Sequence, residues 1–96
     1  MSDDDALEVA LRLKALADPA RVKILSLLFT SASKELNSGE LALALGLTDA
    51  TVSHHVGQLR GAGFIISERR GMNVFHHADR DAVAALCTIV DPNCCR

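Results

Sequence analysis

The residues best suited to chemistry are three cysteines, Cys87, Cys94 and Cys95, which all fall within the last ten positions. An odd number of thiols cannot pair completely within one chain, so a disulfide framework is not expected. In a reducing compartment, clustered thiols serve as ligands for soft ions or as redox-active groups. The carboxy-terminal segment is therefore the first candidate for a functional site.

The number and type of these ligands favour a soft ion bound by sulfur alone. Pro92 ends the predicted last helix, so the chain after it can fold back and bring Cys94 and Cys95 beside Cys87. A structural zinc ion prefers four ligands, whereas trivalent arsenic or antimony takes three sulfurs in a pyramid. We therefore expect no permanently bound cofactor, and As(III) or Sb(III) as a ligand of Cys87, Cys94 and Cys95.

Other interpretations of the three thiols remain open. A thiol redox or persulfide switch would join Cys87 to Cys94 or Cys95, because adjacent free thiols are readily oxidised. Cadmium, lead or another soft ion would use the same sulfurs. Cys87 alone, four residues after Val83 on an apolar face, would be a buried residue at an interface between chains.

Length and composition indicate one small helical domain, residues 1–96. The 96 residues are 49% hydrophobic but include only three aromatic side chains, which favours packed helices over a β-sandwich. No apolar run approaches the roughly 20 residues that span a bilayer, and the acidic start MSDDDALEV is unlike a secretory signal. We expect a cytoplasmic protein with a disordered acidic segment at 1–5 and a cysteine-containing tail at 91–96.

The net charge of −2 does not exclude a nucleic-acid partner, because the charge is unevenly distributed. Four of the twelve acidic residues lie within the first eight positions, and the rest of the chain has ten basic residues against eight acidic ones. This small excess is far from the basic stripe of a dedicated DNA-binding protein. Charge alone therefore decides nothing.

Local signals divide the chain into about five helices and one hairpin. Helical periodicity covers residues 5–17, and Asp18-Pro19 then caps a second helix that reaches about residue 30. A polar connector follows up to about residue 37. A final helix begins after Asp79 and ends before Pro92.

The middle of the chain has the outline of a helix-turn-helix. Asn37 and Glu40 are spaced as a capping box for a helix through Leu45. Gly46 suits a left-handed stop, and Thr48 suits the cap of a second helix over 49–61. Alternating residues over 64–77 then predict a β-hairpin with its tip at Arg69-Arg70-Gly71, and a hairpin in this place is a wing. The predicted fold is mainly α, a winged helix-turn-helix.

Three segments in this order resemble the ArsR/SmtB family of winged-helix repressors: LKALADPARVKILSLL, ELALALGLTDATVSHHVGQLRGAGFI and ERRGMNVFHH. The resemblance covers roughly residues 10–78. It implies a homodimer, joined through its first and last helices, that represses by binding palindromic operator DNA. A last helix followed by an adjacent cysteine pair is similar to the arsenite-responsive branch, in which the inducer releases the DNA.

The helix over 49–61 is the expected recognition helix. Val52, Val56 and Leu59 are spaced to be buried, which turns the polar side chains outward. The resemblance places Asp49, Ala50, Ser53 and His54 at base-reading positions. The full set of predicted DNA contacts is Asp49, Ala50, Thr51, Ser53, His54, Arg60, Arg69 and Arg70, with Lys34 as a further phosphate contact. Many relatives have glutamine in place of Asp49 and a basic residue in place of Gly57, so we expect few phosphate contacts and a shallow salt dependence.

Other metal sites and other classes of function are less well supported by the sequence. The helix before the recognition helix has no cysteine or histidine in Glu40–Leu45, so the metal site of the family's founding members is absent there, and the last helix lacks the histidine of the zinc sensors. His76 and His77 are expected to pack or face solvent. The sequence shows neither a nucleophile with an apparent base nor a phosphate-binding loop, so an enzyme is not expected. A metal chaperone or buffer that does not bind DNA remains the alternative class.

Overall fold

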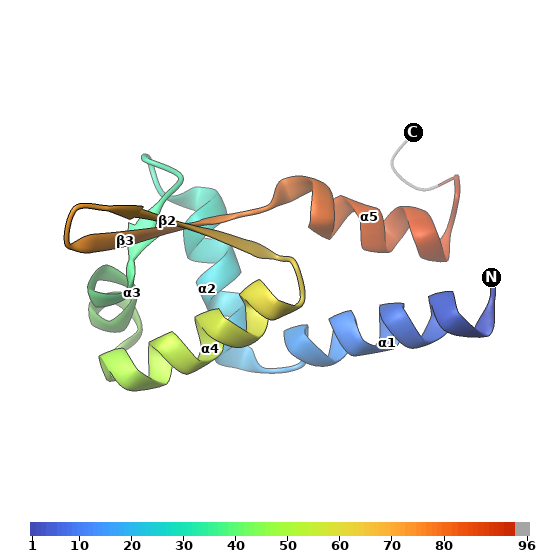
Figure 1. Ribbon diagram of the computed structural model, residues 1–96, viewed down its shortest axis with the longest axis horizontal. Coiled ribbons are helices and arrows are strands. Elements are labelled where there is room, and N and C mark those ends of the chain that lie inside the picture. The colour runs from blue at the N-terminus through green and yellow to red at the C-terminus, as the bar shows by residue number, and fades with distance from the viewer. Residues whose placement is uncertain (94–96) are drawn as a thin grey trace.

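The computed structural model describes residues 1–93 as an elongated molecule of helices around a small sheet (Figure 1). Its elements are α1 (Asp3–Leu16), α2 (Pro19–Thr30), β1 (Leu36–Asn37), α3 (Ser38–Leu45), α4 (Asp49–Gly61), β2 (Ile65–Arg70), β3 (Asn73–Ala78) and α5 (Arg80–Val90). The described residues thus form five helices and one antiparallel sheet of order β1-β3-β2, which confirms the predicted winged helix-turn-helix. Within residues 1–93, no helix has the length and hydropathy needed to cross a membrane.

The predicted helix boundaries follow from capping side chains. The Asp18 carboxylate accepts a hydrogen bond from the N–H of Ala20 at 2.8 Å, directly at the start of α2. Asn37 and Glu40 form the predicted capping box at 2.8 and 3.0 Å, and Gly46 ends α3 with a left-handed φ of 68°. Thr48 and Asp79 cap α4 and α5. Each cap satisfies backbone groups that the helix leaves unpaired, which is why these ends are fixed by sequence.

The amino-terminal helix begins earlier than expected. Ser2 Oγ accepts from the N–H of Asp5 at 3.0 Å, and the aspartates at 3, 4 and 5 occupy the first turn of α1. Negative charges near a helix amino terminus are stabilised by the helix dipole. The expected disorder of residues 1–5 is therefore wrong for residues 3–5.

A short strand lies where the sequence predicted only a polar connector. In β1, Leu36 pairs with His76 and Asn37 pairs with Phe75 of β3. A strand of two residues is too short to show an alternation of apolar and polar side chains, so the sequence did not predict it. The pairing joins the sheet to the start of α3.

The hairpin forms as predicted, but its tip is displaced. Arg70 pairs with Asn73, and Arg69 pairs with Val74, so both arginines end β2 instead of forming the turn. The turn falls at Gly71, with a φ of 62°, and the following residue. We call β2, β3 and this turn the wing.

One core joins α2, α3, α4 and the base of the wing. Its fully buried side chains are Ile24, Leu28, Leu41, Val52, Val56, Leu59 and Phe64. Phe64 stands just before β2, and its carbonyl accepts from the N–H of Asp79 at 2.8 Å. The last helix is thus attached to the core where the wing begins and ends.

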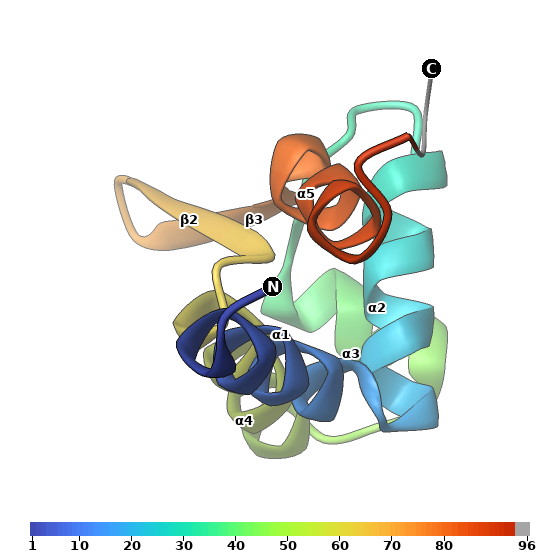
Figure 2. The same ribbon diagram turned by 90° about the vertical axis from the view of Figure 1, so that its right-hand side faces the viewer.

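The helices α1 and α5 extend from the same end of the molecule, away from the wing (Figures 1 and 2). The predicted apolar face of α1 is only partly buried: Val9 is covered, whereas Leu7 and Leu11 are 60% and 58% exposed. In α5, Leu86 is buried and Val90 is 63% exposed. This end therefore carries apolar surface that the single chain does not cover.

Candidate nucleic-acid interface

The helix α4 separates a buried apolar face from an exposed polar one. Val52, Val56 and Leu59 are fully buried, as their spacing predicted. The side chains around them in the first two turns are exposed, namely Asp49, Ala50, Thr51, Ser53 and His54. Short polar side chains at the amino-terminal end of a helix are those that reach base edges in the major groove.

The turn between α3 and α4 fixes the start of this face. Thr48 Oγ1 accepts from the N–H of Thr51 at 3.2 Å and donates to the Thr51 hydroxyl at 2.9 Å. Leu47 donates its N–H to the carbonyl of Ala42 and packs against the core. Among the predicted contacts, Thr51 thus also helps to cap its own helix.

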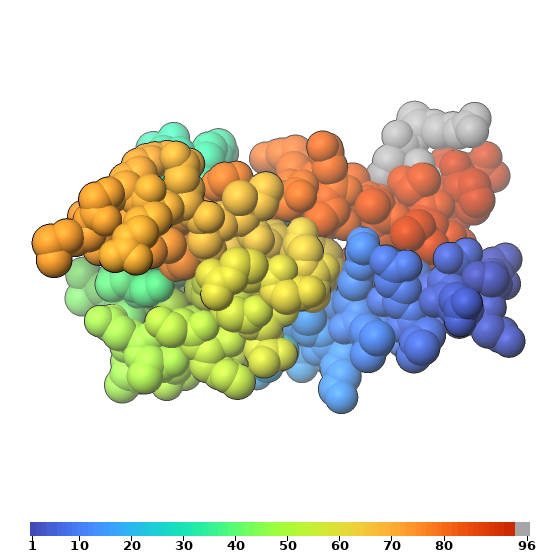
Figure 3. Space-filling model, viewed as in Figure 1, coloured from blue at the N-terminus to red at the C-terminus, as the bar shows by residue number. Residues whose placement is uncertain are grey.

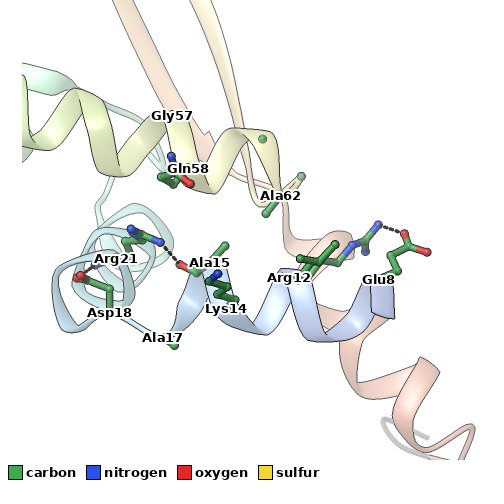
Figure 4. Close-up of a pocket in the computed structure, with 13 residues that line it drawn as sticks. Glu8, Arg12, Lys14, Ala15, Ala17, Asp18, Arg21, Gly57, Gln58 and Ala62 are labelled. Carbon is green, nitrogen blue, oxygen red and sulfur yellow. Dashed lines mark hydrogen bonds and ion pairs between the residues drawn. The ribbon is translucent and has the colours of Figure 1, made fainter. Parts of the chain in front are cut away.

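Arg21 holds α4 from behind. Its Nε donates to Nδ1 of His55 in α4 at 3.2 Å, and its Nη1 donates to the Ala15 carbonyl in α1 at 3.2 Å (Figure 4). One half-buried guanidinium therefore connects α1, α2 and α4. From the sequence, Asp18-Pro19 indicated a helix start, and the link through Arg21 was not predicted. A basic residue in the first turn of an apolar helix was the signal that could have indicated it.

An open groove of about 940 Å³ lies between α1 and the carboxy-terminal half of α4 (Figure 4). Arg12 and Glu8 pair at 2.8 Å on its α1 side. On α4, Gly57 contributes no side chain, and a Cβ built there would meet nothing within 4 Å. Gly57 is therefore not required for close packing, and the groove is separate from the first two turns of α4.

Arg70, a predicted phosphate contact, is held by two carboxylates. Its guanidinium donates to both oxygens of Glu35 at 2.6 and 2.9 Å and to Glu68 at 3.2 Å, and it lies 5.1 Å from the centre of the Phe75 ring. The hydrogen bond from Arg70 lowers the pKa of Glu35, and the bonds to Glu35 and Glu68 raise the pKa of Arg70. Its charge is largely compensated within the chain.

The other predicted cations are less constrained or differently engaged. Arg69 is exposed, and its Nε donates only to a carbonyl of its own turn, that of Gly71, at 3.3 Å. Arg60 is exposed and donates to Ser67 Oγ at 3.0 Å. Lys34 Nζ donates to the Phe29 carbonyl at 2.6 Å. Arg69 is thus less constrained than Arg70 within the described residues.

The two histidines at the end of the wing are in different environments. His76 is buried, with its ring nitrogens 2.9 and 2.8 Å from the hydroxyls of Ser38 and Ser67. His77 is half-buried. No group of three or more His, Cys, Asp or Glu side chains within residues 1–93 is arranged to hold a metal ion.

The predicted sulfur site falls only partly within the described residues. Cys87 is half-buried on α5 and is disulfide-bonded. Cys94 and Cys95 lie outside the described residues. The three-sulfur site therefore stays a prediction.

The geometry agrees with what comparisons of the sequence show. Residues 18–67, from the cap of α2 into β2, match the model of the bacterial regulatory protein family arsR. The chain is 40% identical over 81 residues to the biofilm growth-associated repressor of Agrobacterium fabrum, a match over 84% of this chain and 67% of that protein. It is 33% identical over 81 residues to the HTH-type transcriptional regulator YgaV of Escherichia coli, over 84% and 80%.

Solved structures also resemble the fold of this chain. The solved structure of reduced HlyU from Vibrio cholerae N16961 superposes with a TM-score of 0.73 at 26% identity, over 96% of this chain and 95% of that one. The family model covers more than half of the chain, and the first relative is similar over most of it. The chain therefore belongs to the arsR family of bacterial regulatory proteins and is a DNA-binding transcriptional regulator, not an enzyme.

Proposed function

We propose that this regulator is a repressor that places the first two turns of α4 in the major groove of an operator, with the wing beside the groove. The observation that carries this proposal is the exposed polar start of α4 above a fully buried apolar face. Figure 3 shows α4 and the wing next to each other at the surface of the molecule. Ser53 and His54 would read bases, while Arg60 and Arg69 would contact phosphates.

The operator is a palindrome because the repressor is a homodimer. The exposed leucines of α1 and the exposed end of α5 form an apolar surface at the end away from the wing. A twofold contact through this surface presents two copies of α4, which suits half-sites about one helical turn apart.

Binding to a selected duplex tests the operator proposal. A duplex is first selected by the full chain from a random library, and affinities are then measured by fluorescence anisotropy. We expect Ser53→Ala and His54→Ala each to weaken specific binding about tenfold, the effect of a lost base contact. Gln58→Ala, an exposed α4 residue in the groove toward α1, is the matched control and should bind normally. Equal losses in all three variants would contradict this placement of α4.

Release of the operator is controlled by the three cysteines of the carboxy-terminal segment. Cys87, Cys94 and Cys95 supply three soft ligands and no imidazole, the set that As(III) or Sb(III) takes. Since α5 belongs to the dimer surface, a ligand there changes how the two DNA-binding ends are held. The ligand and DNA then weaken each other's binding by the same factor. Because thiols lose protons on binding, ligand affinity falls at acid pH.

Thiol oxidation is the second candidate for the signal, and one observation favours it: Cys87 is disulfide-bonded. In this case the disulfide, not a bound ion, would change the arrangement of α5. The reduced and oxidised forms would then differ in operator affinity without any added metalloid.

A single titration separates the two signals. The fully reduced protein is titrated with arsenite without oxygen, and free thiols are counted. Loss of three thiols at one equivalent per chain supports the sulfur site, and Cys94→Ser with Cys95→Ser should then bind operator but no longer release it. Absence of tight uptake, together with release by a mild oxidant, would replace arsenite with oxidation.

A further inference from the structure

A chain of hydrogen bonds runs from the recognition helix to the start of α3 through a buried histidine. Arg60 Nη1 donates to Ser67 Oγ at 3.0 Å, and Ser67 Oγ lies 2.8 Å from His76 Nδ1. The other ring nitrogen, Nε2, lies 2.9 Å from Ser38 Oγ. The His76 side chain is only 3% exposed.

These four residues belong to the four elements of the DNA-binding half. Arg60 is in the last turn of α4, Ser67 is in β2, His76 is in β3 and Ser38 is the first residue of α3. The chain of hydrogen bonds therefore sets the position of the recognition helix relative to the wing and to its preceding helix. A buried polar network of this kind favours one arrangement when every member is satisfied.

The neutral imidazole satisfies this network. A guanidinium can only donate, so Ser67 Oγ accepts from Arg60 and its own hydrogen is available to His76 Nδ1. Nε2 then carries the ring hydrogen and donates to Ser38. Protonation of Nδ1 would leave the Ser67 hydrogen without its acceptor and would place a positive charge near Arg60.

The surroundings of the ring also favour the neutral imidazole. Burial lowers the pKa of His76, and the nearby charge of Arg60 lowers it further. Glu68 and His77 are the strand neighbours of Ser67 and His76, so their side chains point to the opposite face of the sheet. On α3, Glu40 is engaged in the capping box with Asn37. On α2, which also packs against β3, Arg21 is bound to His55 and the Ala15 carbonyl, and Lys23 is exposed. In the described part of the chain, Arg60 is therefore the charged group that faces the ring.

We propose that neutral His76 is a positioning residue for operator recognition, and that its protonation loosens α4 from the wing and weakens specific binding. This inference rests on the proposed operator binding. It assigns a pH response to the DNA-binding half, separate from Cys87, Cys94 and Cys95.

The test is the ratio of affinities for the selected duplex and a scrambled duplex, measured with the full chain at about pH 7.5 and about pH 5.5 at one ionic strength. The ratio removes the general gain in affinity that protonation gives any DNA-binding protein. We expect the wild-type ratio to fall about tenfold at the lower pH, the effect of about one hydrogen bond. His76→Gln has no titrating group at position 76, so its ratio should fall about tenfold less than that of the wild type, and His77→Gln should fall like the wild type.

A wild-type ratio that is unchanged by pH, or a His76→Gln ratio that falls as much as the wild type, overturns the inference while operator binding stands. Failure to select any duplex overturns operator binding as well. If His76→Gln does not fold, Ser67→Ala decides, because it breaks the link between Arg60 and His76 and leaves the ring in place. Its ratio should be low already at the higher pH and should change little on acidification.

Discussion

The two ends of this molecule differ in how far their apolar side chains are buried. In α4, the apolar residues Val52, Val56 and Leu59 are 0–1% exposed. In α5, Leu86 is buried but Ile89 and Val90 are 39% and 63% exposed, and the leucines of α1 are exposed with them. A single chain buries the apolar side chains beneath α4, whereas the other end leaves apolar side chains of α1 and α5 exposed.

This difference separates the two tasks of a repressor. The DNA-binding end has its geometry fixed within one chain, by the core, by Arg21 and by the hydrogen bonds around His76. The end with α1 and α5 carries the exposed apolar surface, and Cys87 lies there on α5. In the function we propose, a signal at the cysteines would act on the pairing of two subunits and would leave the recognition helix intact.

The largest effect is expected from the core under α4. Leu59→Ala removes a fully buried side chain, so we expect the free energy of unfolding to fall by about 2–5 kcal/mol. Urea unfolding followed by circular dichroism measures this change. A loss below about 1 kcal/mol would mean that α4 is not fixed by the core as described.

The next effect concerns subunit pairing. Leu11→Glu places a charge on the exposed apolar surface of α1, and we expect the dimer to dissociate at least about tenfold more readily, given the energy of burying one leucine. Analytical ultracentrifugation gives the dissociation constant. Leu43→Glu is the control, because Leu43 is 87% exposed on α3 at the other end and should leave pairing unchanged. Dissociation caused by Leu43→Glu alone would reverse the assignment of the two ends.

A smaller effect distinguishes the neighbouring arginines of the wing. Arg69→Gln should lower the magnitude of the negative slope of log affinity against log salt by about one, since one phosphate contact is lost. Arg70→Gln should change the slope less, because Glu35 and Glu68 already compensate its charge. Glu35→Gln should increase the magnitude of the slope, because it frees Arg70 to contact a phosphate. Equal effects of the two arginine variants would show that the Glu35 pair opens on DNA.

The smallest effect is the pH dependence of stability that comes from His76. Burial lowers the pKa of His76 in the folded state below the ordinary 6.5. At pH values between the folded-state and unfolded-state pKa, the unfolded chain therefore binds more protons than the folded chain. Its contribution to the free energy of unfolding is therefore complete above about pH 6.5 and is lost as the pH falls toward the folded-state pKa. Urea unfolding across this range should show the decline in the wild type and less of it in His76→Gln. The same decline in both would assign it to other groups.

Local chemistry made most of the fold predictable. Asp18, Asn37 and Gly46 determine helix ends through their own backbone neighbours, so one sequence suffices to place them. The two-residue strand β1 depends on a partner some 40 positions later, at Leu36 and His76, and such pairing leaves no local pattern.

The same distinction holds for the candidate interface. The exposed start of α4 follows from the spacing of its buried residues and was predicted. The pairing of Arg70 with Glu35, and the link from Arg60 to His76, join residues far apart in sequence. These contacts depend on how the wing packs on the α2–α3 connection. The sequence therefore identified the charged residues but not the residues with which they pair.

We propose that one end of the molecule meets DNA and the other does not. Backbone amide chemical shifts, followed by NMR while the selected duplex is added, distinguish the two ends. We expect the large changes to fall in residues 49–54 and in the wing near Arg69, with α1 little affected. Changes concentrated in α1 and along the groove behind α4 would contradict it.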